Sequence, residues 1–311
     1  MRVVRGDPRS WGLDRVPRAV TVGVYDGVHL GHRHVVAALR QQAEQAGITD
    51  LAVVTFDPHP LRVVAPSQAP RMLTTVDQRL ELLEGLGLDV AAVVSFDEAV
   101  RELTPAGFAR LVLAEALHAR LVVVGEDFRF GRDRTGNVAS LGELGDVHGF
   151  DVRVVPLVGD DRPVSSTRIR EMVAAGDVAG ASAALGRPHE VRGRVVHGDG
   201  RGSAIGFPTA NLEIPDGTAV PGRGVYAVEA GPLGEPLGPG VANVGVRPTF
   251  GGAAEELVEV HLLDSDRDLY GRELRVRFVA RIRDERRFSG AGELVARIAE
   301  DVAIARSALG A

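Results

Sequence analysis

The ten-residue stretch GVYDGVHLGH, Gly23 to His32, places two histidines, an aspartate and internal glycines directly after the apolar run Ala19 to Val24. A helix that begins near Gly31 would put His29 and His32 at its first turn, where unpaired backbone N–H groups and the positive end of the helix dipole attract anions. The glycines would let the backbone come close to a ligand. The stretch therefore predicts a turn that handles phosphates, and the alternative is a solvated strand-to-helix turn.

A second stretch whose residues could bind a ligand is HGDGRGSAIGFPTANL, His197 to Leu212. Its glycines leave backbone N–H groups free to surround an anion, which predicts a phosphate-binding loop. The alternative is a turn and strand start without a ligand. The glycines are Gly198, Gly200, Gly202 and Gly206.

A third stretch, VEVHLLD from Val258 to Asp264, alternates apolar and polar residues. In a strand, this alternation puts Glu259 and His261 on one face and the apolar residues on the other. Taken alone, such a glutamate is most simply a solvated carboxylate, so its role depends on its surroundings.

The composition limits the chemistry that these stretches can perform. The chain has 311 residues, no cysteine and no lysine, so its 36 basic residues are all arginine. Thiolate catalysis, disulfides and sulfur-ligated metals are excluded, and any phosphate must be held by arginine, histidine, backbone amides or a metal ion. The net charge of -6 and the pI near 5.9 favour small anionic ligands and predict no nucleic-acid partner.

The sequence also predicts a soluble, cytoplasmic chain. No apolar run approaches the roughly 20 residues of a membrane span, which predicts no membrane partner. The segment Met1 to Arg9 is too polar for a signal peptide.

The first half alternates short β-branched runs with helical patterns, which predicts a doubly wound α/β domain with a parallel sheet. The runs are continuously apolar, as expected for strands covered on both faces. Thr75 and Gln78 have the spacing of a capping box. The expected strands are 20–24, 51–56, 90–94, 121–124 and 152–155, and the expected helices are 34–45, 76–86 and a small one at 178–185.

The second half has strands that alternate in polarity between Gly/Pro-rich turns, which predicts a small antiparallel β-barrel. A terminal helix, 293–309, would lay one apolar face against it. We expect GRPHE, Gly186 to Glu190, to be the linker, so that the two domains are residues 1–186 and 187–311. The expected barrel strands are 191–196, 225–229, 258–263 and 274–282.

The first stretch resembles the nucleotidyltransferase signature of the bacterial bifunctional riboflavin kinase/FAD synthetase family. Three further motifs of that family occur in order, at strand ends or before a helix: TFDPHP at 55–60, VGEDFRFG at 124–131 and SSTRIR at 165–170. PTAN at 208–211 resembles the riboflavin kinase signature. The resemblance implies a Rossmann-like nucleotidyltransferase domain followed by a riboflavin kinase barrel, which phosphorylate riboflavin to FMN with ATP and then transfer AMP from ATP to FMN, giving FAD and pyrophosphate.

The resemblance also implies roles for individual residues. In the first domain, His29 and His32 would stabilise charge on the ATP phosphates without attacking them. The nucleotide would be bound by Gly23, Asp26, Gly31, Asp127, Ser166, Thr167 and Arg170.

In the second domain, the glycine-rich loop together with Thr209 and Asn211 would hold the ATP phosphates and Mg²⁺, which prefers oxygen ligands. Glu259 would be the base that accepts the proton of the riboflavin 5′-hydroxyl. Arg283 and Glu285, in RIRDERRF, would touch the flavin ring.

The chain departs from the family pattern at two places. Tyr25 stands where phenylalanine is common, and Ser203 and Ala204 stand where a basic residue and threonine are frequent. The second departure leaves open a relative with one activity, or one that only binds flavin. An adenylyltransferase acting on another phosphorylated cofactor would share the histidine signature, but GFPTAN and Glu259 would then be unexplained. The oligomeric state and the choice between ATP and CTP stay open.

Overall fold

The chain folds as two compact units. The computed structural model describes residues 1–159, 163–198, 202, 205–248, 254–265, 267–286, 288 and 290–311. One unit comprises residues 1–70 and 75–165, and the other comprises residues 71–74 and 166–311. No helix in these ranges is long and apolar enough to cross a membrane.

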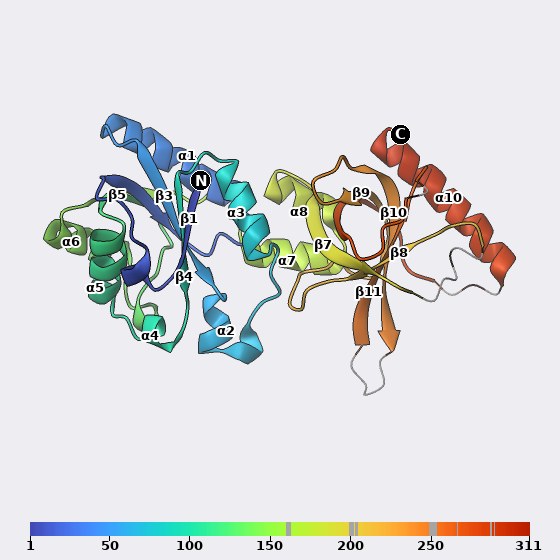
Figure 1. The fold of residues 1–311 in the computed structure, drawn as a ribbon, viewed down its shortest axis with the longest axis horizontal. Coiled ribbons are helices and arrows are strands. Elements are labelled where there is room, and N and C mark those ends of the chain that lie inside the picture. The colour runs from blue at the N-terminus through green and yellow to red at the C-terminus, as the bar shows by residue number, and fades with distance from the viewer. Residues whose placement is uncertain are drawn as a thin grey trace. The chain divides into compact units, whose positions relative to one another are not determined.

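A six-stranded parallel sheet forms the centre of the first unit (Figure 1). Its strand order is β1-β4-β3-β2-β5-β6. The central strands β2 and β4 are buried almost throughout, which explains their continuous apolar sequence. The five expected strands are present, with ends shifted by one or two residues. The strands are β1 (Arg2–Gly6), β2 (Arg18–Val22), β3 (Asp50–Asp57), β4 (Val90–Ser95), β5 (Ala119–Gly125) and β6 (Asp151–Val155).

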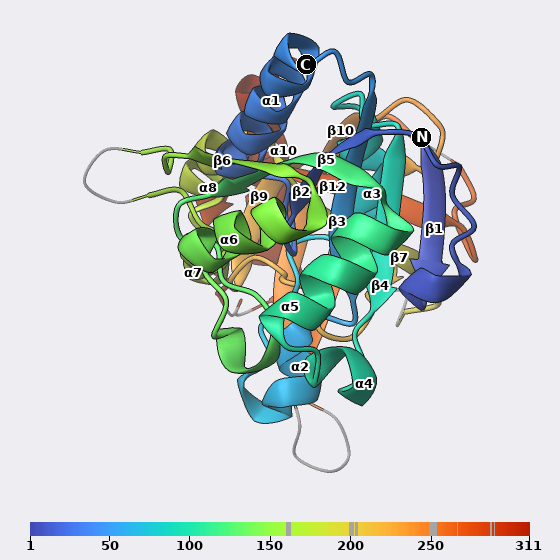
Figure 2. The same cartoon turned by 90° about the vertical axis from the view of Figure 1, so that its left-hand side faces the viewer.

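Helices cover both faces of this sheet (Figure 2). Apolar side chains of α1 and α3 pack on one face, and those of α5, η3 and α6 pack on the other. Helix α3 begins with the expected capping box of Thr75 and Gln78. The elements are η1 (Pro8–Ser10), α1 (Leu30–Gln45), α2 (Pro60–Val64), η2 (Pro66–Gln68), α3 (Val76–Glu84), α4 (Glu98–Arg101), α5 (Pro105–Phe108), η3 (Ala109–Ala116), η4 (Arg132–Arg134) and α6 (Val138–His148).

The second unit is a closed antiparallel barrel in the order β10-β11-β8-β7-β12-β9. Its interior is filled by alternate apolar residues from all six strands, as the alternating sequence predicts. The sequence pattern predicts four of the strands and misses β8 and β10. The strands are β7 (His189–Val196), β8 (Ala210–Glu213), β9 (Gly224–Pro232), β10 (Gly238–Pro248), β11 (Ala254–Leu262) and β12 (Glu273–Arg283).

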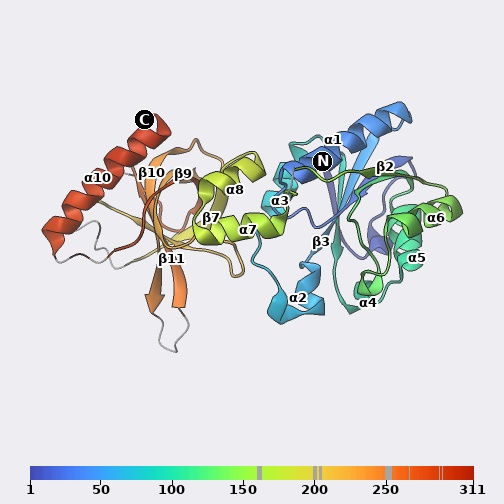
Figure 3. The ribbon, with the colours of Figure 1, turned by 180° about the vertical axis from the view of Figure 1, so that it is seen from behind.

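In the described part of this unit, the helices are α7 (Ser166–Ala175), α8 (Val178–Leu185) and α10 (Ala291–Leu309). The terminal helix α10 packs along the outside of the barrel (Figure 3). There Ala305 joins Val225, Ala227 and Val241 in an apolar cluster. Val178 of α8 joins the barrel core.

Two expectations about local structure need correction here. SSTRIR does not precede a helix, because Ser166 begins α7 and the motif forms its first turns. The expected linker is also shorter than GRPHE, since Gly186 caps α8 in a left-handed conformation and His189 and Glu190 already belong to β7. His189 is buried and its Nε2 donates a hydrogen bond to the carbonyl oxygen of Ala219, at 2.8 Å.

Candidate active sites

The turn between β2 and α1 is shaped by residues in the left-handed region. Tyr25 and Gly27 have φ angles of 55° and 81°. His29 is the N-cap of α1, and its Nδ1 accepts a hydrogen bond from the backbone N–H of His32 at 3.3 Å. The helix thus begins at Leu30, one residue before the start that the motif predicts and four residues before the expected helix 34–45. The reason is that the imidazole of His29 caps the first turn, where an oxygen acceptor is usual.

The two histidine rings of this turn stack on each other. Their centroids are 3.6 Å apart with an interplanar angle of 17°, and the Tyr25 ring lies 4.8 Å from His32. A Cβ on Gly31 would stand 3.1 Å from Cε1 of His29. Glycine at this position therefore makes room for the imidazole of His29.

The two histidines differ in their protonation chemistry. Loss of hydration lowers the pKa of His32 well below its usual value, and the charges of His29 and Arg79 lower it further. His32 is therefore neutral at neutral pH. Since Nδ1 of His29 accepts a hydrogen bond, a neutral His29 carries its proton on Nε2, where it can donate to an anionic oxygen.

Arg79 is a residue of this site that the sequence analysis missed. Its side chain is buried on α3, and Nη1 donates to Oγ1 of Thr55 at 3.0 Å and to the carbonyl oxygen of Phe56 at 3.2 Å. The Thr55 hydroxyl in turn donates to the carbonyl oxygen of Val24 at 2.8 Å. Arg79 thus ties the carboxyl ends of β2 and β3 together and places a fixed positive charge near His32. An arginine on the apolar face of α3 is the signal that could have revealed it.

Three other residues predicted to bind nucleotide lie at strand ends of the same sheet edge. Gly23 and the buried Asp26 follow β2, and the exposed Asp127 follows the neighbouring strand β5. The carboxylate of Asp127 lies close to Gly125, with Oδ1 3.1 Å from the position that a Cβ would take. Ligands of open α/β sheets bind at this edge, so the structure brings these residues to the expected place.

The predicted phosphate ligands Ser166, Thr167 and Arg170 lie in the first turns of α7, which belongs to the second unit. Thr167 is exposed, whereas Ser166 and Arg170 are half-buried. Their role toward the first unit stays a prediction.

In the barrel, a row of neighbouring residues crosses five strands. Asn211 on β8 pairs with Glu259 on β11, which pairs with Asn243 on β10. Asn243 pairs with Val225 on β9, which pairs with Arg283 at the end of β12. Directly opposite residues of an antiparallel pair share a face, so the row joins three predicted site residues that are far apart in sequence. We call these five residues the outer row.

The outer row lies on the outside of the barrel. Val258 and Val260, which flank Glu259, point into the core, as do Ala242 and Val244, which flank Asn243. Glu259 is therefore half-buried on the opposite face. The sequence analysis did not select Asn243, since β10 was not predicted.

Two described glycines of the glycine-rich stretch, Gly198 and Gly202, lie close to Asn211 and Thr209. A Cβ on Gly198 would overlap the side-chain amide of Asn211, and a Cβ on Gly202 would lie 3.2 Å from Oγ1 of Thr209. Gly206 has a φ of 87°, which favours glycine. Gly200, Ser203 and Ala204 lie outside the described residues, so the departure from the family pattern cannot be placed on the structure.

The oxygen atoms of Thr209 and Asn211 suit a hard cation. Oδ1 of Asn211 is buried and has no hydrogen-bond partner within the described ranges. The backbone before Thr209 is held by His261, whose Nδ1 donates to the carbonyl oxygen of Pro208 at 2.8 Å. Among the described residues, no group of three or more histidines, aspartates or glutamates could hold a metal ion.

The predicted flavin residues Arg283 and Glu285 lie at the other end of the outer row. The guanidinium of Arg283 is bound by Asp301 of α10 through two nitrogen atoms, and its Nη1 donates to the backbone oxygen of Asp284 at 2.9 Å. Glu285 is exposed, and its carboxylate lies over Gly245 of β10.

Comparison with known proteins decides the family. Residues 14–168 match the family model described as FAD synthetase, and residues 185–309 match the one described as riboflavin kinase. The Escherichia coli K12 protein named bifunctional riboflavin kinase/FMN adenylyltransferase is 40% identical over 315 residues, which cover 100% of this chain and 98% of that protein. The chain belongs to the bifunctional riboflavin kinase/FMN adenylyltransferase family. Another member, from Bacillus subtilis strain 168, is 37% identical over 93% of this chain and 91% of its own.

One solved structure has the same fold as this chain over nearly its whole length. It is described as a macrolide-efflux protein from Streptococcus pneumoniae and is 30% identical, with a TM-score of 0.88 over 98% of this chain and 99% of that one. The likeness thus extends over both units.

Proposed function

We propose that this chain converts riboflavin to FMN and FMN to FAD, using ATP in both steps. The observation that carries the proposal is the outer row, in which Glu259 lies between two asparagines. One of them, Asn211, has a side-chain oxygen with no hydrogen-bond partner among the described residues and lies close to Gly198. Both family models support the pair of activities.

In the kinase step, Glu259 accepts the proton of the riboflavin 5′-hydroxyl as that oxygen attacks the γ-phosphorus of ATP. The bond to the β–γ bridging oxygen breaks, and ADP leaves. Gly198 and Gly202 approach Asn211 and Thr209 closely, and their lack of a side chain leaves room for phosphates beside backbone N–H groups. Positioning and charge neutralisation supply most of the rate in phosphoryl transfer.

In the adenylyl transfer step, a phosphate oxygen of FMN attacks the α-phosphorus of ATP and pyrophosphate leaves. His29 donates through Nε2 to a phosphate oxygen, and the N–H groups at the start of α1 add their dipoles. His32 stays neutral and supports the ring of His29 by stacking. The nucleotide binds at the carboxyl edge of the sheet, beside Gly23, Asp26, Gly31 and Asp127. Its phosphates are bound by Ser166, Thr167 and Arg170.

We propose Mg²⁺ as the cofactor of the kinase, held by Thr209 and Asn211 together with ATP oxygens, where it would neutralise phosphate charge. The buried oxygen of Asn211, which has no partner in the described part of the chain, supports this assignment. Arg283 and Glu285 contact the flavin ring of riboflavin. The partners are small molecules only, namely riboflavin, FMN and ATP, and the protein works in the cytoplasm, where ATP and Mg²⁺ are available.

We propose that the functional domains are residues 1–186 and 187–311. The start of the riboflavin kinase match at residue 185 supports this boundary. Because Val178 of α8 packs in the barrel core, a kinase fragment from residue 166 is expected to melt at a higher temperature than one from residue 187.

The test is to incubate the protein with riboflavin, ATP and Mg²⁺ and to separate the flavins by chromatography. FMN followed by FAD is the expected result. If the protein makes FAD from added FMN but no FMN from riboflavin, it has only the adenylyltransferase activity. If it binds flavin but forms no product, both proposed activities are wrong.

A further inference from the structure

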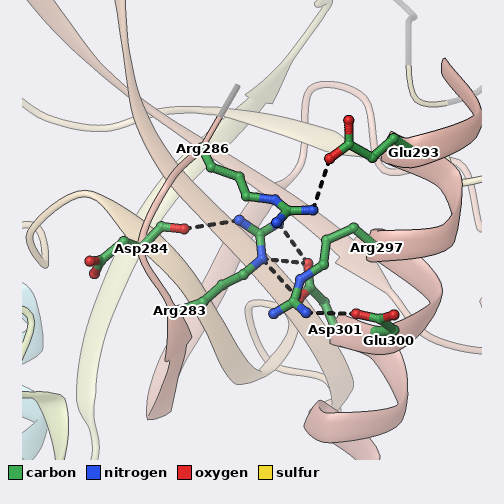
Figure 4. A network of polar contacts seen from close by, with 7 residues as sticks. All are labelled: Arg283, Asp284, Arg286, Glu293, Arg297, Glu300 and Asp301. Carbon is green, nitrogen blue, oxygen red and sulfur yellow. Dashed lines mark hydrogen bonds and ion pairs between the residues drawn. The ribbon is translucent and has the colours of Figure 1, made fainter. Parts of the chain in front are cut away.

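The carboxylate of Asp301 on α10 is the centre of a buried ion-pair network (Figure 4). Its side chain is only 2% exposed. Oδ1 lies 2.9 Å from Nε of Arg283, and Oδ2 lies 2.7 Å from Nη2 of the same residue. Nε of Arg297, one turn earlier on α10, lies 3.2 Å from Oδ1. Two parallel hydrogen bonds to one guanidinium fix its orientation as well as its position.

Arg283 passes this constraint to the segment that follows β12. It is the last residue of the strand and the last member of the outer row. Its Nη1 donates to the backbone oxygen of Asp284 at 2.9 Å, so that the chain leaves the strand in a fixed direction. One residue later comes Glu285, which lies outside any strand.

Glu285 lies over the backbone of β10. Its Oε1 is 2.8 Å from the position that a Cβ on Gly245 would take, and Nδ2 of Asn243 is 3.8 Å from that position. Asn243 stands directly opposite Glu259. The segment held by Arg283 therefore reaches the middle of the outer row.

We propose that Asp301 is a positioning residue of the kinase site: through Arg283 it holds Glu285 over β10 and so fixes the place where riboflavin binds. The inference rests on the proposed function. A carboxylate on the terminal helix, 42 positions beyond Glu259, thus acts on flavin affinity without being part of the proton transfer.

The variants Asp301→Asn and Glu285→Gln of the full chain test this inference. Asparagine keeps the shape of Asp301 but has no charge and only one acceptor oxygen, so it cannot form the two parallel hydrogen bonds that Oδ1 and Oδ2 accept from Arg283. The expected result is a rise in the riboflavin KM on the order of 10- to 100-fold with little change in kcat or in the ATP KM, since a small displacement weakens binding equally before and in the transition state. The riboflavin KM of the double variant should be no higher than that of the more strongly affected single variant, because both changes disturb the same contact.

The matched control is Arg306→Gln on the same helix, which breaks a surface ion pair with Asp264, a side chain that is 69% exposed and lies outside the network of Asp301. It should leave all constants unchanged. FAD formation from supplied FMN should stay at the wild-type rate in every variant, which separates this inference from the proposed function as a whole. A folded Asp301→Asn protein with an unchanged riboflavin KM overturns the inference. So does a double variant whose rise in riboflavin KM is the product of the rises in the two single variants.

Gly245→Ala keeps the inference testable if Asp301→Asn does not fold. A methyl group there would collide with the carboxylate of Glu285 and displace it while leaving the ion pairs of α10 intact. The riboflavin KM should rise as in the other variants, with a melting temperature near that of the wild type. An unchanged KM in this variant would mean that the position of Glu285 does not determine flavin binding.

Discussion

The two candidate sites are built in opposite ways. The turn of the first unit takes both histidines from one ten-residue stretch, and local contacts fix them: an N-cap, a ring stack and the close approach of Gly31. The outer row takes single residues from five strands and is fixed by the register of a closed barrel. We infer that damage to the turn stays local, whereas the outer row depends on distant packing such as that of α10.

The largest expected effect concerns Glu259. A primary hydroxyl has a high pKa, so a general base contributes on the order of 10²- to 10⁴-fold to the rate. Glu259→Gln keeps the size and shape of the side chain but cannot accept the proton. It should lower kcat for FMN formation by that factor with little change in the riboflavin KM, as measured by steady-state kinetics.

Glu229→Gln on β9 is the matched control, because Glu229 is a half-buried strand glutamate outside the outer row. It should keep full activity. Undiminished FMN formation by Glu259→Gln would make Glu259 an ordinary strand carboxylate.

His29→Ala should produce the complementary defect. Loss of one donor to the reacting phosphates costs on the order of 10²- to 10³-fold in rate. FAD formation should fall by that factor while FMN accumulates, since only the first unit is changed. His34→Ala, at an exposed position on the same helix, is the control. Equal loss of both products from a folded His29→Ala protein would contradict the separation of the sites.

A smaller effect tests the local support of the turn. The buried hydroxyls of Thr21 and Tyr25 lie 2.6 Å apart, and burial raises the pKa of Tyr25 although the hydrogen bond from Thr21 lowers it. Thr21→Val or Tyr25→Phe alone leaves one hydroxyl without a partner and should cost about 1–3 kcal/mol of unfolding free energy. The double variant should recover most of that loss in denaturant titrations. Additive losses would show that the hydrogen bond is not what couples them.

The smallest effect is a pH dependence. The pKa of His32 is lowered in the folded protein, so at mildly acidic pH the unfolded chain binds a proton that the folded chain does not. Stability should therefore fall as the pH drops below about 6.5, by at most about 1.4 kcal/mol per pH unit. His32→Gln should flatten this slope, whereas His34→Gln should not. Thermal melting between pH 7 and 5 checks both, and parallel slopes for wild type and His32→Gln would refute the burial of His32.

These two ways of building a site also explain what the sequence could predict. The turn could be predicted because its residues are contiguous in sequence. The buried strands could be predicted because their apolar runs are continuous. Asn243 and Arg79 were missed because barrel register and the packing of α3 are tertiary facts. Edge strand β1, with its mixed polarity, gave no clear pattern. The pairing of Arg283 with Asp301 likewise has no local signature.

The most direct test of the account is to mix the Glu259→Gln and His29→Ala proteins. Each should make little FAD from riboflavin and ATP alone, because one lacks FMN formation and the other lacks adenylyl transfer. If the two chemistries occupy separate sites, the mixture should restore FAD production, with FMN made by His29→Ala used by Glu259→Gln. Failure of the mixture, when Glu259→Gln still adenylylates added FMN and His29→Ala still releases FMN, would contradict the claim that the two sites work independently.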